Sequence, residues 1–435
     1  MMEALRMKEN QTMKNGWKNL CERVKTLFYD PHGGEQLFWI GFILYLGVAV
    51  WATTMFPQFG VISKSFKLCF IACMGLKILL YDRYAMKEVA AIILSGICVV
   101  GTLYEARYVD PFMWLLLLIA SRGIQFRKIL QVYLLVAGGI CVLAFAASML
   151  DIIENLQYET DTRGIRNSFG IIYPTDCGAH VFFWMLSLFY LLGERIRGIH
   201  CIAGIFAGFL VYRFCNARVD AGCIIMTALL FWIGNFIVVE KKSSRRIFQI
   251  WNKLWERLGP LVMPGMAILS IILTALYQGG NSVWNVFDST LIARLRYGQQ
   301  AFTEYGIKLF GQKIEMVGNG GSLELKGEYF FLDCSYVNIL MTWGIVALLI
   351  VLALFWHACR KNRKDLHFQY AIAVIAVNCV IAHHMMDIAY DPFVLAAVAA
   401  GMGKGIHEAP KFKKEFSKCH RINMVIGRKH QLFTL

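Results

Sequence analysis

About a dozen long apolar segments divide this 435-residue chain. Most of them are long enough for a helix that crosses a bilayer, which needs about 20 apolar residues. Hydrophobic residues make up 57% of the chain and charged residues only 17%, so the sequence predicts an all-α, polytopic membrane protein with about 12 spans. The segment at 110–121 is short and is expected to be re-entrant or buried among other helices. The expected spans are residues 37–55, 66–81, 88–104, 110–121, 129–150, 177–193, 198–212, 221–239, 260–277, 335–357, 369–385 and 390–404.

Lysine and arginine are concentrated on one side of these spans. With the N-terminus inside, the alternate loops and the two terminal segments hold 31 of the 44 Lys and Arg residues. The positive-inside rule therefore places residues 1–36 and the basic tail at 405–435 in the cytoplasm. The net charge of +15 is attributed to orientation and to anionic lipid, and no nucleic-acid partner is expected. Residues 1–36 lack the apolar core of a cleavable signal peptide, so none is expected.

The loops on the other, outer side are unequal in length. Residues 37–277 hold the first nine spans and an outer loop at 151–176, and residues 335–404 hold the last three spans. Between them lies a large outer loop at 278–334, in which residues 290–309 are expected to form an amphipathic helix at the membrane surface. Long loops beside short ones usually carry function, so the outer side is the expected place for a site.

Cysteine and nucleotide-binding motifs give little indication of chemistry. Most of the 13 cysteines lie inside apolar segments, where they behave as small hydrophobic side chains. No C-x-x-C pair occurs, so neither a zinc site nor a disulfide framework is predicted. No P-loop or Rossmann fingerprint appears, and HHMMD at 383–387 is only a weak signal for a metal.

Arginines on the outer side run against the orientation bias. Near the bilayer a cation costs free energy unless a negative group compensates it. If the helices gather these arginines round one cavity, they form a clamp for a diphosphate, because guanidinium groups bind phosphate oxygens bidentately. Alternatively, each arginine pairs with a nearby carboxylate: Asp161, Asp220 or Asp288. Three outer segments each supply a pair, namely Arg163 and Arg166, Arg213 and Arg218, and Arg294 and Arg296.

Candidate proton acceptors lie on the same side. Asp333 stands where the large loop meets the next span, and it is either a base or the N-cap of the following helix. His383 and His384 are candidates for proton transfer. Because neighbouring residues of a helix point to different faces, both histidines can line one cavity only if the backbone there is irregular.

Three stretches carry a resemblance to a known family: LIARLRYGQQAFTEYGIKLFGQ, LDCSYVNILMTWGIVALLI and CNARVDAG. They resemble the O-antigen polymerase and ligase family, which includes the Wzy-type polysaccharide polymerases and the lipopolysaccharide ligases. The resemblance places Arg294 and Gly311 at the family's loop arginine and loop glycine. It places Arg218, in CNARVDAG, at the arginine of the family's short segment. In the second stretch the family has a His-Asn pair, then an aromatic-aliphatic step and a glycine on the next span. Asp333, Tyr336 and Gly344 stand at these positions. Asp333 and Cys334 stand where ligases have a His-Asn pair, which favours a polymerase.

The resemblance implies a GT-C-like helical fold and a membrane glycosyltransferase of the bacterial cytoplasmic (inner) membrane. Its substrates would be undecaprenyl-diphosphate-linked repeat units, joined at the outer face into O-antigen, capsule or exopolysaccharide without a metal or other cofactor. Membrane lipid, a flippase and a chain-length regulator are the implied partners. The expected catalytic residues are Asp333, Arg294, Arg218 and His384, and the expected substrate-binding residues are Arg163, Arg166, Arg296, Tyr297 and Tyr336, with Tyr173 and Tyr329 as further candidates for stacking on sugars.

Two alternatives remain. One is a ligase or another lipid-linked glycosyltransferase, which would use a similar site. The other is a transporter, such as a lipid-linked oligosaccharide flippase. Transporters usually show two similar halves, and no repeat is seen between residues 37–193 and 198–404.

Overall fold

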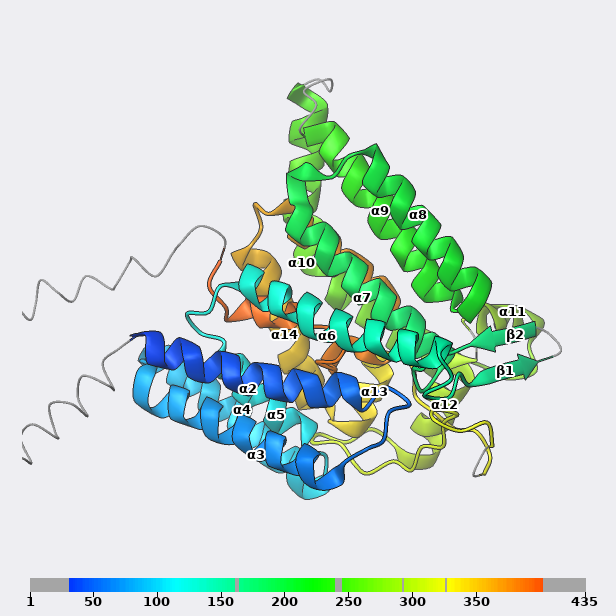
Figure 1. Cartoon of the computed structure of the whole chain (residues 1–435), viewed down its shortest axis with the longest axis horizontal. Coiled ribbons are helices and arrows are strands. Elements are labelled where there is room, and N and C mark those ends of the chain that lie inside the picture. Colours follow the sequence, from blue (N-terminus) through cyan, green and yellow to red (C-terminus); the bar gives the residue numbers. More distant parts are fainter. Residues whose placement is uncertain (1–30, 161–163, 239–244, 292, 325–326, 402–435) are drawn as a thin grey trace, which may run out of the picture.

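The computed structural model describes residues 31–160, 164–238, 245–291, 293–324 and 327–401. Arg163, most of the N-terminal segment and the basic tail lie outside the described residues. The described chain is mostly helical and forms a helical bundle with a roughly triangular outline (Figure 1). Within it, seven helices are long and apolar enough to cross a membrane, which supports an all-α membrane protein: His32–Trp51, Met86–Glu105, Phe126–Met149, Pro174–Arg195, Gly198–Cys215, Arg218–Ile237 and Gln249–Leu276.

The first part of the chain follows the expected spans closely. Helix α2 packs against α3 and α6, and α4 packs against α5. Helix α5 is short and largely buried, as its sequence predicts, and the indole nitrogen of Trp114 donates to the carbonyl of Met386 at 2.6 Å. The elements are α2 (Pro31–Trp51), α3 (Gly60–Leu76), the π-helical turn η1 (Lys77–Tyr81), α4 (Met86–Glu105), α5 (Asp110–Ala120) and α6 (Phe126–Met149).

The middle of the chain adds a hairpin that the sequence did not predict. Strands β1 (Gln157–Thr160) and β2 (Gly164–Asn167) pair antiparallel, with Tyr158 opposite Arg166. The elements that follow are α7 (Pro174–Leu192), η2 (Gly193–Arg195), α8 (Gly198–Leu210), η3 (Val211–Cys215) and α9 (Arg218–Val238).

Helix α10 (Arg245–Leu276) begins well before its expected start at 260. The expected spans place the basic, amphipathic stretch WNKLWERL in a loop, but in the structure it continues the helix. Pro260 and Pro264 lie inside α10. The helix packs against two later helices, α14 (Ile345–Lys361) and α15 (Leu366–Asn378), and this packing offsets the backbone hydrogen bonds that the two prolines cannot make.

The last third of the chain departs most from the expected spans. The surface helix expected at 290–309 is α12, which is shorter. The expected span at 335–357 is broken at Trp343–Gly344, and the span expected at 369–385 ends at Asn378. Residues 390–401 contain no α-helix, although the sequence predicted a span there. The elements are α11 (Ser282–Thr290), α12 (Arg294–Tyr305), α13 (Ser335–Thr342), α14 (Ile345–Lys361), α15 (Leu366–Asn378) and the 3-10 turns η4 (His384–Met386) and η5 (Phe393–Ala397).

Burial within the protein explains these last differences. Nearly all residues between Ile388 and Ala397 are enclosed by other helices, so their apolar character reflects a protein core and not contact with lipid. The described chain therefore does not confirm 12 continuous spans.

The break between α13 and α14 is closed by the large loop. Residues 308–311 run beside it, and the amides of Ile345 and Val346 donate to the carbonyls of Lys308 and Leu309 at 3.1 and 3.2 Å. Gly344 adopts φ 95° and Gly311 adopts φ 79°. A Cβ atom on either residue would overlap the backbone of the other segment. The LFG sequence thus fixes the loop to the bundle at this break.

Candidate functional site

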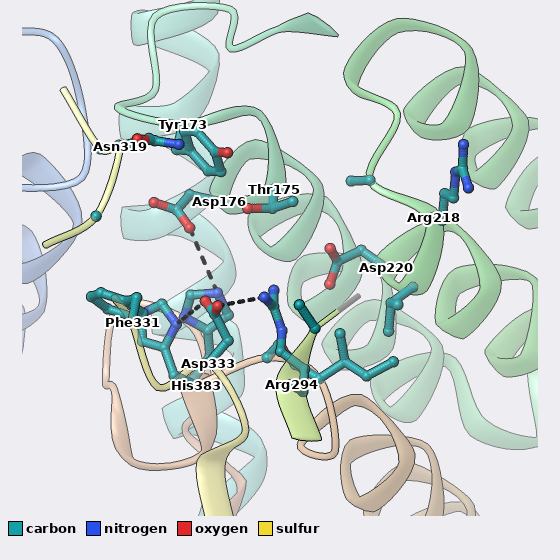
Figure 2. Close-up of a pocket in the computed structure, with 18 of the residues that line it drawn as sticks. Tyr173, Thr175, Asp176, Arg218, Asp220, Arg294, Asn319, Phe331, Asp333 and His383 are labelled. Carbon is teal, nitrogen blue, oxygen red and sulfur yellow. Dashed lines mark hydrogen bonds and ion pairs between the residues drawn. The ribbon is translucent and has the colours of Figure 1, made fainter. Parts of the chain in front are cut away.

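A cavity of about 440 Å³ opens at the end of the bundle where β1, β2 and α12 lie (Figures 1 and 2). Its walls come from segments far apart in the sequence, and all of them are segments that the sequence places on the outer side. The wall segments are residues 166–176 before and at the start of α7, 216–220 at the start of α9, 293–297 at the start of α12, 318–320 and 329–333 in the large loop, and 381–384 after α15.

Three of the expected outer arginines, one from each pair, line this cavity. Arg166, Arg218 and Arg294 belong to the wall. Arg213 and Arg296 are exposed beside it, and their guanidinium groups lie over the rings of Phe214 and Tyr297 at 5.7 and 4.9 Å. The structure therefore brings three of the expected arginines together and leaves Arg296 outside the lining.

Arg166 is buried in the wall, with only 5% of its surface exposed. Its Nε donates to the carbonyl of Cys215 at 3.1 Å, and its guanidinium lies 5.4 Å from the ring of Tyr173. The carbonyl is available because the π-helical turn η3 ends there and Asn216 adopts a left-handed conformation, with φ 47°. Nη2 of Arg166 has no hydrogen-bond partner among the described residues. A buried guanidinium with an unused donor suits an anionic ligand.

Arg218 begins α9 and is exposed at the cavity. Its Nε donates to Oδ1 of Asn216 at 3.1 Å. It does not pair with Asp220 in the described structure, because Asp220 is buried and its Oδ1 accepts a hydrogen bond from Nδ2 of Asn378 at 2.9 Å. For Arg218 the carboxylate-pairing alternative is therefore wrong.

Arg294 is paired with Asp333, at 2.7 Å between Nη1 and Oδ2 (Figure 2). Its Nε also donates to the carbonyl of Ile381 at 3.1 Å. The expected alternative partner, Asp288, instead accepts backbone N–H groups of Leu295 and Arg296 at 3.1 Å and so caps α12.

Asp333 is not the N-cap of the following helix. Helix α13 begins at Ser335, and Cys334 occupies the N-cap position. The Asp333 carboxylate turns into the cavity, where Oδ2 also accepts a hydrogen bond from the Tyr329 hydroxyl at 3.3 Å. The structure thus favours the site interpretation of Asp333 over the cap.

Both histidines line the cavity, because the chain between α15 and η4 is not helical. His383 Nδ1 lies 3.7 Å from Oδ1 of Asp333. Burial opposes charge on this imidazole, but the hydrogen bond and the charge of Asp333 outweigh burial and raise the pKa of His383 above its usual value.

His384 is the more enclosed of the two, with Nε2 3.8 Å from Oδ1 of Asp176 and its ring stacked on Tyr390 at 3.9 Å. Burial, followed by the charge of His383, holds the pKa of His384 well below its usual value. His384 is therefore neutral and enclosed, whereas His383 has a carboxylate partner at the cavity.

The expected tyrosines divide between cavity and core. Tyr173, Tyr297 and Tyr329 line the cavity. Tyr336 does not: it is fully buried, and its hydroxyl donates to the carbonyl of Ala376 at 2.9 Å. The expectation that Tyr336 binds substrate is therefore wrong, because its side chain packs between α13 and α15.

Two further wall residues are acidic: the sequence pointed to Asp220 only as a partner for Arg218, and it did not point to Asp176. Asp176 and Asp220 lie in the first turns of α7 and α9 and line the cavity beside the arginines. Acidic residues in a first helical turn are common because they suit the positive helix end. The available signal was their position at the start of apolar segments on the arginine side.

The described residues contain no group of three or more His, Cys, Asp or Glu side chains that could hold a metal ion. Comparison with known proteins adds no identification, since no protein-family model, curated protein or solved structure matches this chain.

Proposed function

We propose that this protein is a polysaccharide polymerase that joins undecaprenyl-diphosphate-linked repeat units at the outer face of the bacterial cytoplasmic membrane. One observation carries the proposal. Three arginines from separate segments face a single cavity that also holds the Asp333–His383 pair. Displacement of a diphosphate by a hydroxyl group needs cations that bind the leaving diphosphate and a base that accepts the hydroxyl proton, and these residues can supply both.

The arginines bind the diphosphate of the donor in this proposal. Arg166 lies in the cavity wall with Nη2 unbonded among the described residues, and Arg218 takes part in none of the ion pairs found among them. Arg294 also belongs to the cavity wall, where its guanidinium is paired with Asp333 (Figure 2). As the bond between sugar and diphosphate breaks, negative charge grows on the leaving oxygen, and guanidinium groups fixed in advance stabilise it.

His383 is the proposed base. A hydroxyl group of the acceptor sugar attacks the anomeric carbon, its proton passes to the imidazole, and the bond electrons leave with undecaprenyl diphosphate. Asp333 holds the imidazole and stabilises its protonated form, as a carboxylate does in other base-carboxylate pairs. A single displacement inverts the anomeric centre. Tyr173 and Tyr297 offer rings on which the sugars stack.

The cavity arginines have matched controls in the same chain. Cells carrying Arg294→Ala or Arg218→Ala are compared with cells carrying Arg296→Ala or Arg213→Ala, with the parent and with a deletion, and glycan chain length is measured on gels. The expected result is single repeat units at the outer face for the cavity variants and long polymer for the controls.

Other outcomes would point to the alternatives. Repeat units trapped on the cytoplasmic side of the membrane would mean that the protein moves lipid-linked sugars. Normal polymer that fails to reach its final lipid acceptor would mean a ligase. Full-length polymer in a folded Arg294→Ala protein would refute the clamp.

A further inference from the structure

A second cavity, of about 850 Å³, lies at the other end of α7. Asp176 in the first turn of α7 lines the candidate site, whereas the end of the helix and η2 line this cavity. The 19 residues of α7 span about 28 Å, close to the thickness of the hydrocarbon core. In a bilayer that α7 crosses, the two cavities would lie at opposite surfaces.

The second cavity is strongly basic. Its cationic lining residues are Arg127, Arg195, Arg360, Lys361, Arg363 and Lys364, against the carboxylates of Glu194 and Asp365. Asp365 is already engaged, since Oδ1 accepts from the amide of Phe368 at 3.1 Å and Oδ2 accepts from the Tyr190 hydroxyl at 2.9 Å. Within the described chain, Arg195, Arg363 and Lys364 have no carboxylate within ion-pair distance. Their charge is left for a ligand to neutralise.

Orientation alone does not require this arrangement. The positive-inside rule asks only that cations lie on one side, yet here residues from the ends of α6, α7 and α14 share one cavity. Leu366 and His367 in the first turn of α15 also line the cavity, but the N-terminus of this helix is capped by the Asp365 carboxylate. Recognition of an anion therefore depends on the clustered guanidinium and ammonium groups, which are the chemistry that recognises phosphate.

We infer that this cavity binds a phosphate-bearing ligand, and that its source is the headgroup of an anionic phospholipid. The cavity lies at the N-terminal end of the candidate span Phe126–Met149 and at the C-terminal end of the candidate span Pro174–Arg195, which is headgroup depth. Arg360 lies over the exposed ring of Trp356 at 5.5 Å, and tryptophan at this depth marks a membrane interface. This site is independent of the proposed glycosyl transfer.

The test uses the full chain, purified in a neutral detergent and stripped of lipid. Binding of dioctanoyl phosphatidylglycerol, dioctanoyl phosphatidylcholine and inorganic diphosphate is measured by native mass spectrometry and by the shift in thermal midpoint. The variant Arg195→Gln/Arg363→Gln/Lys364→Gln is compared with Arg197→Gln/Lys253→Gln/Arg257→Gln, which removes the same charge from exposed residues outside the lining.

Phosphatidylglycerol is expected to bind the parent and the control, and to bind the cavity variant about 10- to 100-fold more weakly. Diphosphate binding without phosphatidylglycerol binding would assign the same cavity to a soluble phosphate compound. Equal weakening in both triple variants, or equal binding of phosphatidylcholine, would overturn the inference. If the triple variant does not elute as a folded protein, Arg363→Gln alone is tested and must weaken phosphatidylglycerol binding by itself.

Discussion

Gly311 and Gly344 lie back to back, each with a positive φ, and neither position has room for a side-chain carbon. Gly311 ends the LFG stretch of the large loop, and Gly344 stands at the break between α13 and α14. Phe310, between them and α4, packs onto Gly101, where a Cβ would come within 2.7 Å of its ring. The loop that supplies Arg294 and Asp333 is thus anchored to the bundle by glycine contacts.

Replacing either glycine should destabilise the protein. Gly311→Ala or Gly344→Ala introduces both a strained φ and a backbone clash, so we expect the free energy of unfolding to fall by ~3 kcal/mol or more. Gly96→Ala in α4 is the control, because no atom lies within 4 Å of the added carbon. Thermal unfolding in detergent measures the difference, and equal midpoints for Gly311→Ala and Gly96→Ala would contradict the described contact.

Asp333→Asn should change the pH dependence of polymer formation. The Asp333 charge raises the pKa of His383, so in the parent the imidazole becomes a free base only as pH rises through a value above its usual one. Removing that charge lowers the pKa, and the acid limb of the pH profile should move to lower pH. Asp176 and Asp387 act in the same direction and remain, so the shift is partial.

The maximal rate of Asp333→Asn should also fall, by about 100-fold or more, because the imidazole loses its support. Polymer formation in membrane vesicles that contain the lipid-linked repeat unit provides the measurement, with Asp151→Asn at an exposed position as the control. A midpoint that stays in place or moves to higher pH would exclude His383 as a base supported by Asp333.

Arg166→Lys should impair activity although it preserves charge. An ammonium group has one nitrogen, so it cannot both reproduce the hydrogen bond from Nε to the Cys215 carbonyl and keep a second nitrogen at the position of Nη2. We expect a loss of about 10- to 100-fold in polymer formation. Arg213→Lys, at an exposed position outside the cavity, should behave as the parent, and parental activity in Arg166→Lys would remove Arg166 from the clamp.

Asn378→Leu should destabilise the protein through Asp220. The buried Asp220 carboxylate would lose its amide donor, at a cost of about 1–3 kcal/mol in the free energy of unfolding. Adding Asp220→Asn should restore part of this loss, because a neutral amide is less costly to bury. Thermal unfolding of the single and double variants checks the expectation, and an Asn378→Leu protein as stable as its parent would contradict it.

Hydropathy was sufficient for most helices up to α9, but it misplaced the start of α10 and was insufficient for the last third of the chain. Helices such as α4 and α6 leave apolar side chains exposed, and their apolar length gives their bounds within a few residues. At 390–401 an equally apolar stretch folds into turns, because a core enclosed by protein is as apolar as lipid. The break before α14 left one signal in the sequence, Gly344, which an apolar average conceals.

The charge argument found the arginines but could not choose between them. Arginine on the outer side is costly, and that cost marked Arg166, Arg218 and Arg294 in the sequence. Whether Arg294 or Arg296 faces inward depends on how α12 is rotated, and α12 begins only after Ala293 takes a left-handed conformation, with φ 62°. His383 and His384 could line one cavity only if the backbone there was irregular, and the structure has such a segment between α15 and η4.

The lining of the candidate site runs from Arg166 to His384, so its walls are synthesised in a fixed order. A growing chain that has reached residue 380 already contains the seven candidate spans of the described part, the last of which ends at Leu276. It still lacks the segment 381–384, which carries both imidazoles and the Ile381 carbonyl that accepts a hydrogen bond from Arg294. Synthesis of the candidate spans and completion of the cavity are therefore separate events during translation, and a chain interrupted between them would contain all seven of those spans but an incomplete cavity.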